Sequence, residues 1–288
     1  MTGGLLQLVA YGAQDVFLTG NPQITFFKIV YRRHTNFAME SIQQDLAGSN
    51  SLSTSSVNGV CTVGRNGDLL HKVYVCSDSS GIVNGDKIIS DVSVQIGGTI
   101  IDKQTREWMQ IWNELSTRES KANGFKAMTG CVGSSGTTGV NFVQIPLLFW
   151  FCRNPGLALP LIAMQYSDVK LDFNFGTTTE IASGSAVSVT ILCQYIFLDT
   201  EERRRFAQTS HEYLIEQLQF QSAGATVSSY SLNFNHPIKE LVWTESAVTT
   251  EKANLIMNGR DRFDARSKEF FQIRQPYDYH TAVPAQNY

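Results

Sequence analysis

Short runs of β-branched and aromatic residues, separated by turn-forming residues, recur along most of this chain and constrain its fold more than any other feature. Residues 92–96 alternate valine or isoleucine with serine or glutamine and end at Gly97-Gly98, which is typical of a half-buried strand. Further β-prone runs occupy 24–31, 143–151, 161–175, 187–198, 213–220, 231–234, 238–243 and 270–273. This density predicts an all-β, antiparallel β-sandwich.

In the first half of the chain, Asn-Gly pairs occur at 58–59, 66–67, 84–85 and 123–124. The first three lie between β-prone runs, so they predict hairpin turns. Residues 48–59 and 130–139 are rich in glycine, serine and threonine, which predicts surface loops.

One convincing helix interrupts the strands. Trp108, Ile111, Trp112 and Leu115 recur at helical spacing, with Asp102 as the expected N-cap and Asn123-Gly124 beyond the end. A second, shorter helix is expected near 200–207. Asp199 and Glu202 there have the spacing of a capping box, although aspartate replaces the usual serine or threonine.

The order of these patterns predicts four parts. Residues 1–24 form an N-terminal arm, 25–198 a first β-domain, the polar stretch 199–212 a linker, and 213–288 the start of a second β-domain. A chain of 288 residues is long enough for one large or two ordinary domains.

Composition narrows the functional classes. Only 17% of residues are charged and the net charge is −3, so the chain lacks the basic excess of a general nucleic-acid-binding protein. The five cysteines are scattered without a C-x-x-C pair, which favours reduced thiols. The most apolar run, 145–151, is too short to span a bilayer.

No catalytic motif is present in the sequence. His211-Glu212 begins like a zinc-protease helix, but position 215 is isoleucine where a second histidine is required. Asp168 and Asp172 are four residues apart on an expected strand, about 13 Å between Cβ atoms, which exceeds the usual glycosidase spacing. We interpret the five histidines as structural and the Trp108/Trp112 pair as core. We therefore expect no enzyme activity, catalytic residue, metal or cofactor.

The opening of the chain closely resembles a known family. It reads LVAYGAQDVFLTGNP at 8–22, then ITFFK at 24–28 and YRRHTNF at 31–37. Similar patches follow in the same order: ELS at 114–116, IPL at 145–147, FWF at 149–151, LPLIA at 159–163, DTEERRRF at 199–206 and PIKELVW at 237–243. Together they resemble the major capsid proteins of nucleocytoplasmic large DNA viruses, the group that includes phycodnaviruses and iridoviruses.

The resemblance implies two consecutive eight-stranded jelly rolls in each chain. It implies homotrimers with a pseudo-hexagonal outline that tile an icosahedral shell, with minor capsid proteins and an internal virion membrane as neighbours. The protein would then reside in the virion after assembly in the host cytoplasm, without specific nucleic acid binding. The alternative that the β-pattern leaves open is a carbohydrate-binding β-sandwich, such as a lectin or attachment module.

Two further expectations concern the ends of the chain. Residues 1–24 carry more apolar side chains than a free tail usually does, so we expect an assembly arm, with packing against its own domain as the alternative. Its candidate contact residues are Leu8, Tyr11, Asp15, Phe17, Leu18, Asn21 and Pro22. The stretch 244–268 is polar, so 213–288 holds too few strands for a complete jelly roll, and we expect the reading frame to continue past Tyr288.

Overall fold

The computed structural model describes residues 13, 25–27, 34–131, 142–181, 186–222, 229–244 and 250–284. The chain divides into two units, Met1–Phe37 and Ala38–Tyr288. In the first unit, the described residues 25–27 contain a turn and no strand, and the rest of the β-prone run 24–31 lies outside the described residues.

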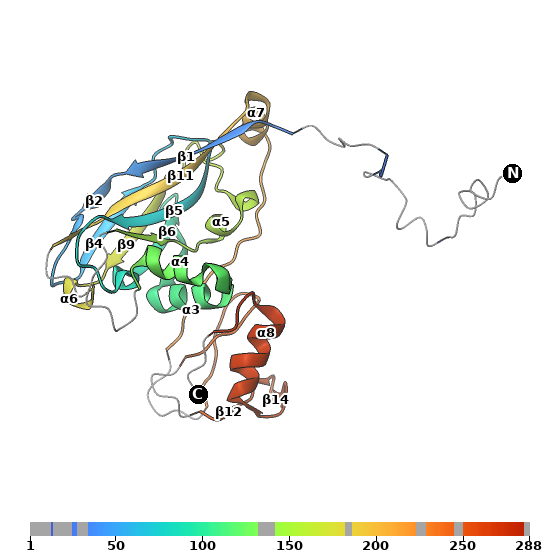
Figure 1. Cartoon of the computed structure of the whole chain (residues 1–288). Helices are drawn as coiled ribbons and strands as arrows, with labels where there is room; N and C mark the ends of the chain where they lie inside the picture. The colour runs from blue at the N-terminus through green and yellow to red at the C-terminus, as the bar shows by residue number, and fades with distance from the viewer. Residues whose placement is uncertain are drawn as a thin grey trace. The chain divides into compact units, whose positions relative to one another are not determined.

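Two antiparallel sheets pack face to face in the second unit (Figure 1). The first has the order β1-β11-β5-β8 and the second β2-β4-β9-β6-β7. Their strands are β1 Phe37–Gln44, β2 Leu46–Gly48, β4 Val57–Thr62, β5 Leu69–Ser77, β6 Ile89–Ile96, β7 Thr99–Thr105, β8 Val143–Pro146, β9 Val169–Phe175 and β11 Thr190–Leu198. Leaving aside the three-residue β2, eight strands are divided four and four, in the strand order of a jelly roll. The predicted antiparallel β-sandwich is confirmed.

The core lies between the sheets because alternate residues of each strand point inward. In β9 every second residue from Val169 to Phe175 is buried, and the rings of Phe173 and Phe175 stack with centroids 5.5 Å apart. Val92 and Val94 of β6 are fully buried, as their alternation with polar residues predicts. Tyr195 of β11 is the largest fully buried side chain.

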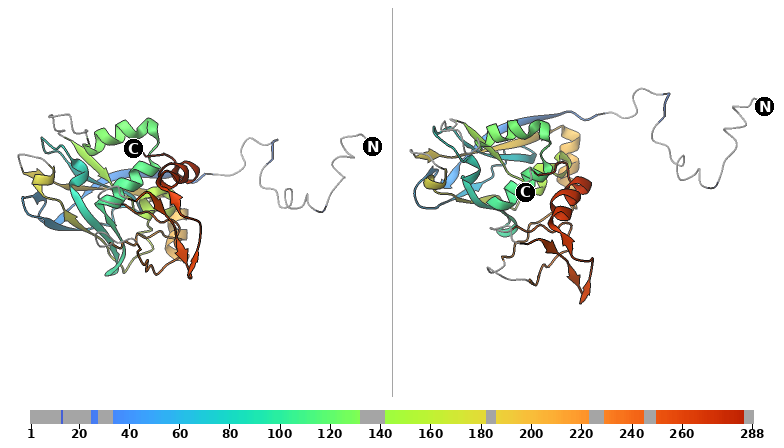
Figure 2. Two further views of the ribbon diagram at one scale, coloured as in Figure 1. Left: turned by 90° about the horizontal axis from the view of Figure 1, so that it is seen from below. Right: turned by 60° about the horizontal axis from the view of Figure 1, so that its bottom comes forward.

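Helices α3 (Arg106–Ser116) and α4 (Glu119–Thr129) lie along one side of the sandwich (Figure 2). The predicted helix is confirmed as α3, but Thr105 caps it, with its side chain accepting from the N–H of Trp108. The predicted cap, Asp102, is instead a buried residue of β7. Asn123-Gly124 does not end a helix either, because it lies inside α4, which ends at Gly130 in the left-handed conformation.

The predicted Asn-Gly hairpins are wrong. Residues 58–59 lie inside β4, which pairs with β2 and β9. Residues 66–67 connect β4 to β5 in the other sheet, and Gly85 begins the short 3-10 helix η1 (Gly85–Lys87). A tight hairpin turn joins β6 to β7 at Gly97-Gly98, where both glycines have positive φ angles of 59° and 85°, and another lies at Asn258-Gly259. The predicted surface loop 48–59 also contains β3 (Ser51–Leu52), which pairs with β10 (Val187–Ser188).

Two further β-prone runs in the sandwich were assigned too broadly. In 143–151 the strand ends at Pro146, and Trp150–Arg153 form the short helix α5. In 161–175 the strand begins only at Val169, after turns that follow Pro160. Short helices η2 (Pro155–Leu157) and α6 (Thr178–Ile181) complete this region. Of the predicted loop 130–139, only 130–131 are described.

The expected helix near 200–207 is confirmed as α7 (Thr200–Gln208), with the Asp199 side chain accepting from the N–H of Thr200 at 2.8 Å. We call residues 209–284 the C-terminal segment. Its described part forms two small strand pairs, then the π-helix η3 (Phe270–Arg274) and α8 (Gln275–Tyr279). The pairs are β12 (Lys252–Ala253) with β15 (Arg266–Ser267) and β13 (Ile256–Met257) with β14 (Arg260–Asp261).

The strands predicted in the C-terminal segment are not formed. Runs 213–220, 231–234 and 238–243 have no backbone ladder, and 270–273 is helical. The helix η3 lets the adjacent Phe270 and Phe271 point in different directions, toward different neighbours. Phe271 contacts Trp243, with ring centroids 4.9 Å apart, whereas Phe270 lies beneath the guanidinium of Arg266 at 4.3 Å.

Candidate functional site

All seven candidate residues of the assembly arm lie outside the described residues: Leu8, Tyr11, Asp15, Phe17, Leu18, Asn21 and Pro22. The arm therefore stays a prediction, and the described surface of the second unit supplies the site geometry.

Three of the five histidines make structural contacts, namely His71, His211 and His280. The ring of His71 is buried and lies 2.9 Å from the carbonyl oxygen of Phe151. His211 lies 2.8 Å from the carbonyl oxygen of Phe206 and stacks on the Phe206 ring. Within the described ranges no three histidine, cysteine or acidic side chains converge on a possible metal position. Nor is any described helix both long and apolar enough to cross a bilayer.

The acid pair considered from the sequence has no shared function in the structure. Asp168 lies 3.6 Å from the guanidinium of Arg65, whereas Asp172 accepts a hydrogen bond from Gln95. Each carboxylate therefore has its own partner on the sandwich.

Four cysteines are buried packing residues of the sandwich. Burial raises the pKa of Cys61 and Cys76 to about 11 and that of Cys152 to about 12, and it also raises the pKa of Cys193. Their thiolate forms, which are the nucleophilic ones, are thus strongly disfavoured at neutral pH.

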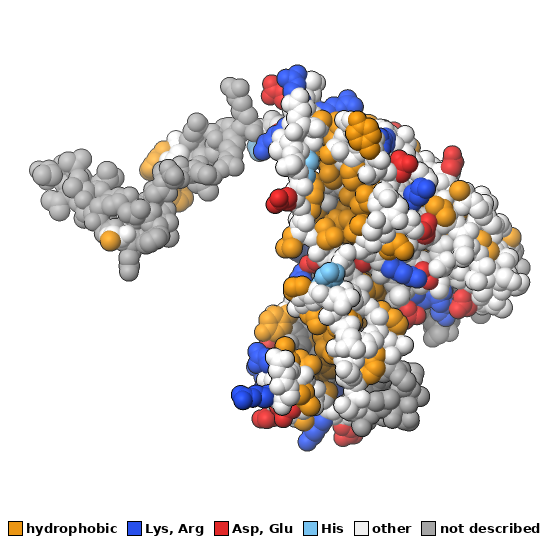
Figure 3. All heavy atoms as spheres, turned by 180° about the vertical axis from the view of Figure 1, so that it is seen from behind, with side chains coloured by type: hydrophobic (Ala, Val, Ile, Leu, Met, Phe, Trp, Pro, Cys, Tyr) orange, Lys and Arg blue, Asp and Glu red, His pale blue; other side chains and the backbone are white. Residues whose placement is uncertain are grey.

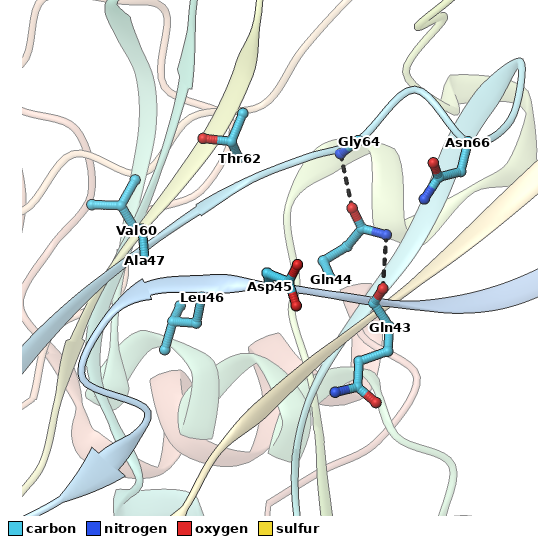
Figure 4. A pocket seen from close by; sticks show the side chains of 9 residues that line it. All are labelled: Gln43, Gln44, Asp45, Leu46, Ala47, Val60, Thr62, Gly64 and Asn66. Carbon is cyan, nitrogen blue, oxygen red and sulfur yellow. Dashed lines mark hydrogen bonds between the residues drawn. The ribbon is translucent and has the colours of Figure 1, made fainter.

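A polar groove of about 520 Å³ lies where the chain passes from β1 to β2 (Figure 4). Gln44 spans it, accepting from the N–H of Gly64 at 2.9 Å and donating to the carbonyl of Gln43 at 3.1 Å. The other lining residues are Asp45, Leu46, Ala47, Val60, Thr62 and Asn66. The groove combines amide, hydroxyl and carboxylate groups without an aromatic side chain.

A cluster of charged and aromatic side chains joins the sandwich to the C-terminal segment. We call Trp112, Arg153, Glu216, Glu240 and His280 the junction cluster. The guanidinium of Arg153 bonds to Glu216 at 2.6 Å and lies 4.1 Å from the ring centre of Trp112. His280 meets the other members through an edge contact with Trp112 and a 2.6 Å contact with Glu240.

Backbone groups reinforce this junction. Buried Asp102 accepts the N–H of Leu218 at 2.9 Å, and the amide of Gln217 donates to the carbonyl of Ile101. Burial raises the pKa of Asp102, and the hydrogen bonds from Leu218 and Gln104 oppose that shift. The N–H of Ala282 donates to Leu115 at the end of α3, so both ends of the C-terminal segment are tied to β7 and α3.

Side chains replace a backbone ladder between two extended runs of the C-terminal segment. Gln219 accepts the N–H of Asn235 and Gln221 accepts that of Asn233, both at 3.1 Å. Gln221 also donates to the carbonyl of Ser231. Runs 219–221 and 231–235 therefore lie antiparallel, further apart than paired strands.

Large apolar side chains are exposed across the surface of the unit, as the space-filling view shows in part (Figure 3). In the C-terminal segment they include Leu214, Phe220, Ile238, Ile256, Tyr277 and Tyr279. Singly exposed apolar residues are ordinary on protein surfaces, and only a contiguous patch of them is typical of a surface that another protein covers.

Sequence reasoning missed the junction cluster. Its five members lie between positions 112 and 280, and only the fold brings them together. The half-buried Trp108 and Trp112 are not simply core, because Trp112 contacts Arg153 and His280. Taken together, the described residues form exposed surfaces and structural ion pairs and hydrogen bonds.

Comparisons with known proteins agree with this geometry. The family described as "Major capsid protein N-terminus" matches residues 25–205, and "Large eukaryotic DNA virus major capsid protein" matches 202–251. The major capsid protein of Pyramimonas orientalis virus is 48% identical, over 99% of this chain and 78% of the relative. That of Phaeocystis pouchetii virus is 44% identical, over 84% of this chain and 58% of the relative, so the chain spans less than two thirds of that protein.

A solved structure titled "PBCV-1 virus capsid, quasi-atomic model" is similar to 90% of this chain and 78% of the compared chain. Its TM-score is 0.74 and its sequence identity is 31%. The match extends beyond the sandwich, which ends at Leu198.

Proposed function

Because the chain belongs to the major capsid proteins of large eukaryotic DNA viruses, we propose that it builds the virion shell as homotrimers with a pseudo-hexagonal outline. In this proposal trimers tile an icosahedral lattice. Closed symmetric assembly requires complementary flanks on each copy, and a surface with few charged residues suits contacts with other copies.

The observation that carries the proposal is the jelly roll of β1 to β11 together with its similarity to a solved virus capsid at a TM-score of 0.74. A β-sandwich alone would also suit the lectin alternative. The family match over residues 25–205 distinguishes the two, because it concerns capsid proteins specifically.

We propose no chemical step for this protein. The relatives are named as capsid proteins, and buried cysteines and bonded histidines are explained by packing. Its work would be mechanical: to present stable surfaces at fixed angles to neighbouring copies.

The parts of the chain would share this work. Residues 1–24 would be the assembly arm, with Leu8, Tyr11, Asp15, Phe17, Leu18, Asn21 and Pro22 in its contacts. The jelly roll would form one body of the capsomer, and 213–288 would begin a second, fastened by the junction cluster. Minor capsid proteins and the internal membrane would be the further neighbours, with assembly in the host cytoplasm.

Purified virus particles test the proposal. The protein should be the most abundant band of the particles, and antibodies against it should label an icosahedral shell in electron micrographs. A scarce protein, or one that labels only isolated fibres and elutes from an immobilised glycan with free sugar, would support the attachment module instead.

A further inference from the structure

The connection between β4 and β5 is fixed to the sandwich core on both sides of Arg65. The N–H of Gly64 donates to Gln44, as Figure 4 shows, and its carbonyl accepts from the buried Tyr195 hydroxyl at 2.7 Å. Gly67 lies so close to Tyr195 that an added Cβ would be 2.6 Å from the Cβ of that tyrosine. Arg65 thus projects from a rigid support.

Arg65 in turn holds the turn 164–168, which precedes β9. Its guanidinium donates to the carbonyl oxygens of Gln165 at 2.6 Å and Met164 at 2.7 Å, and lies 3.6 Å from the carboxylate of Asp168. The carbonyl of Asp168 also accepts from the N–H of Gly97, at 3.1 Å, in the β6–β7 turn. The backbone of turn 164–168 is therefore held by two neighbouring connections.

Tyr166 projects from this fixed turn into solvent, with 99% of its surface exposed. A tyrosine offers a large contact area with few rotatable bonds, so it is enriched among the residues that dominate binding energy. Because the fold already orders the backbone here, binding through Tyr166 would lose little conformational entropy.

We propose that the Tyr166 turn, residues 164–168, is a contact surface for a second copy of this chain. The proposal rests on the proposed function of self-assembly. The only charged side chain in the turn, Asp168, lies beside Arg65, so the turn presents no unpaired charge. Anionic lipid or nucleic acid would require free lysine or arginine, whereas another copy of this weakly charged chain would not.

The test compares Tyr166→Ala with Tyr279→Ala, which removes a tyrosine of α8 that is 77% exposed. Self-association of the full chain is measured by sedimentation, with thermal unfolding as the folding control. Tyr166→Ala should weaken self-association at least tenfold with an unchanged melting temperature, because contact tyrosines often carry that much binding energy. The Tyr279→Ala protein should associate more tightly than Tyr166→Ala.

Association of Tyr166→Ala at the wild-type level would overturn the inference while leaving the capsid function standing. A wild-type chain that never self-associates would refute both. Loss of binding to phosphatidylserine vesicles, with self-association intact, would assign the turn to a membrane instead and would equally overturn the inference.

Arg65→Met removes the contacts that Arg65 makes with the turn 164–168 while Tyr166 remains. Self-association should weaken severalfold, and limited proteolysis should begin within 164–168, because the carbonyl oxygens of the turn lose their common donor. Wild-type association combined with rapid cleavage of the turn would show that preorganisation does not contribute.

Discussion

At the scale of the residue, Arg153 makes the contacts that fasten the C-terminal segment to the sandwich. It bonds to Glu216, donates to the carbonyl of Leu148 at 3.0 Å and stacks over Trp112. A lysine could not reproduce this set, because the planar guanidinium both stacks and donates in several directions.

We expect Arg153→Met to lower the free energy of unfolding by about 1–2 kcal/mol, because a charge-assisted bond and a cation–π contact disappear from a partly buried position. Hydrogen exchange should rise first at residues 213–218. Arg204→Met, on the exposed side of α7, serves as the control. Equal exchange in the two variants would show that Arg153 does not hold the segment.

Asp102 gives a prediction about pH. Burial raises its pKa in the folded protein, so the folded state binds more protons and stability falls as pH rises from about 4 through the raised pKa. Asp102→Asn keeps an oxygen acceptor for Leu218 and removes the buried charge. In urea titrations it should be as stable as wild type, or more so, at pH 7, and this advantage should shrink as the pH falls.

Asp102→Leu should behave differently. It leaves the N–H of Leu218 and the amide of Gln104 without their acceptor, which should cost about 1–3 kcal/mol. If the Asn and Leu variants lose the same stability at pH 7, the hydrogen bond to Leu218 does not contribute.

Capping residues show what local sequence could predict at this scale. Asp199 was identified correctly because its effect is local, on the N–H of the next residue. Asp102 was mistaken for a cap because its partner, Leu218, is more than a hundred residues away. The members of the junction cluster, and the residues that Arg65 contacts, are likewise far apart in the sequence. Local patterns could therefore not predict these contacts.

At the scale of the element, two glycines that both follow asparagine have opposite roles. Gly85, at the start of η1, packs against the end of α4, and an added Cβ would lie 2.2 Å from the carbonyl oxygen of Thr129. Gly124 is exposed inside α4 with open space around it. The sequence predicted a hairpin turn at the first pair and a helix end at the second, and it missed this difference because the difference depends on packing against distant residues.

Gly85→Ala should therefore destabilise the protein by about 1–3 kcal/mol, the usual cost of overpacking a tight position. Gly124→Ala should stabilise it by about 0.5–1 kcal/mol through helix propensity. Chemical denaturation of both variants measures these changes. A Gly85→Ala protein as stable as wild type would mean that α4 and η1 do not pack as described.

The strands of the sandwich were predictable where apolar and polar residues alternate in the sequence, as in β6, and only partly so where turns follow proline, as before β9. In the C-terminal segment, the β-prone runs 213–220, 231–234 and 238–243 did not form strands, whereas the polar stretch 244–268 holds β12 to β15. Strand pairing depends on distant partners rather than on local propensity, and here Gln219 and Gln221 bridge the extended runs instead.

At the scale of the whole molecule, resemblance to a family predicted the fold class correctly, because long motifs such as that at 8–22 carry more information than periodicity. It could not supply the contacts of one copy with another.

We expect deletion of residues 1–24 to leave a folded protein, with an unchanged circular dichroism spectrum, that assembles poorly. Normal shells from the deleted protein would show that the arm has no role in assembly.

The mass of the purified protein in solution tests the central claim most directly. Light scattering coupled to size exclusion should give three times the 32.0 kDa chain mass, and electron micrographs should show particles with threefold symmetry and a hexagonal outline. A protein that stays monomeric at every concentration, or that associates only when a glycan is added, would contradict a self-assembling capsid protein.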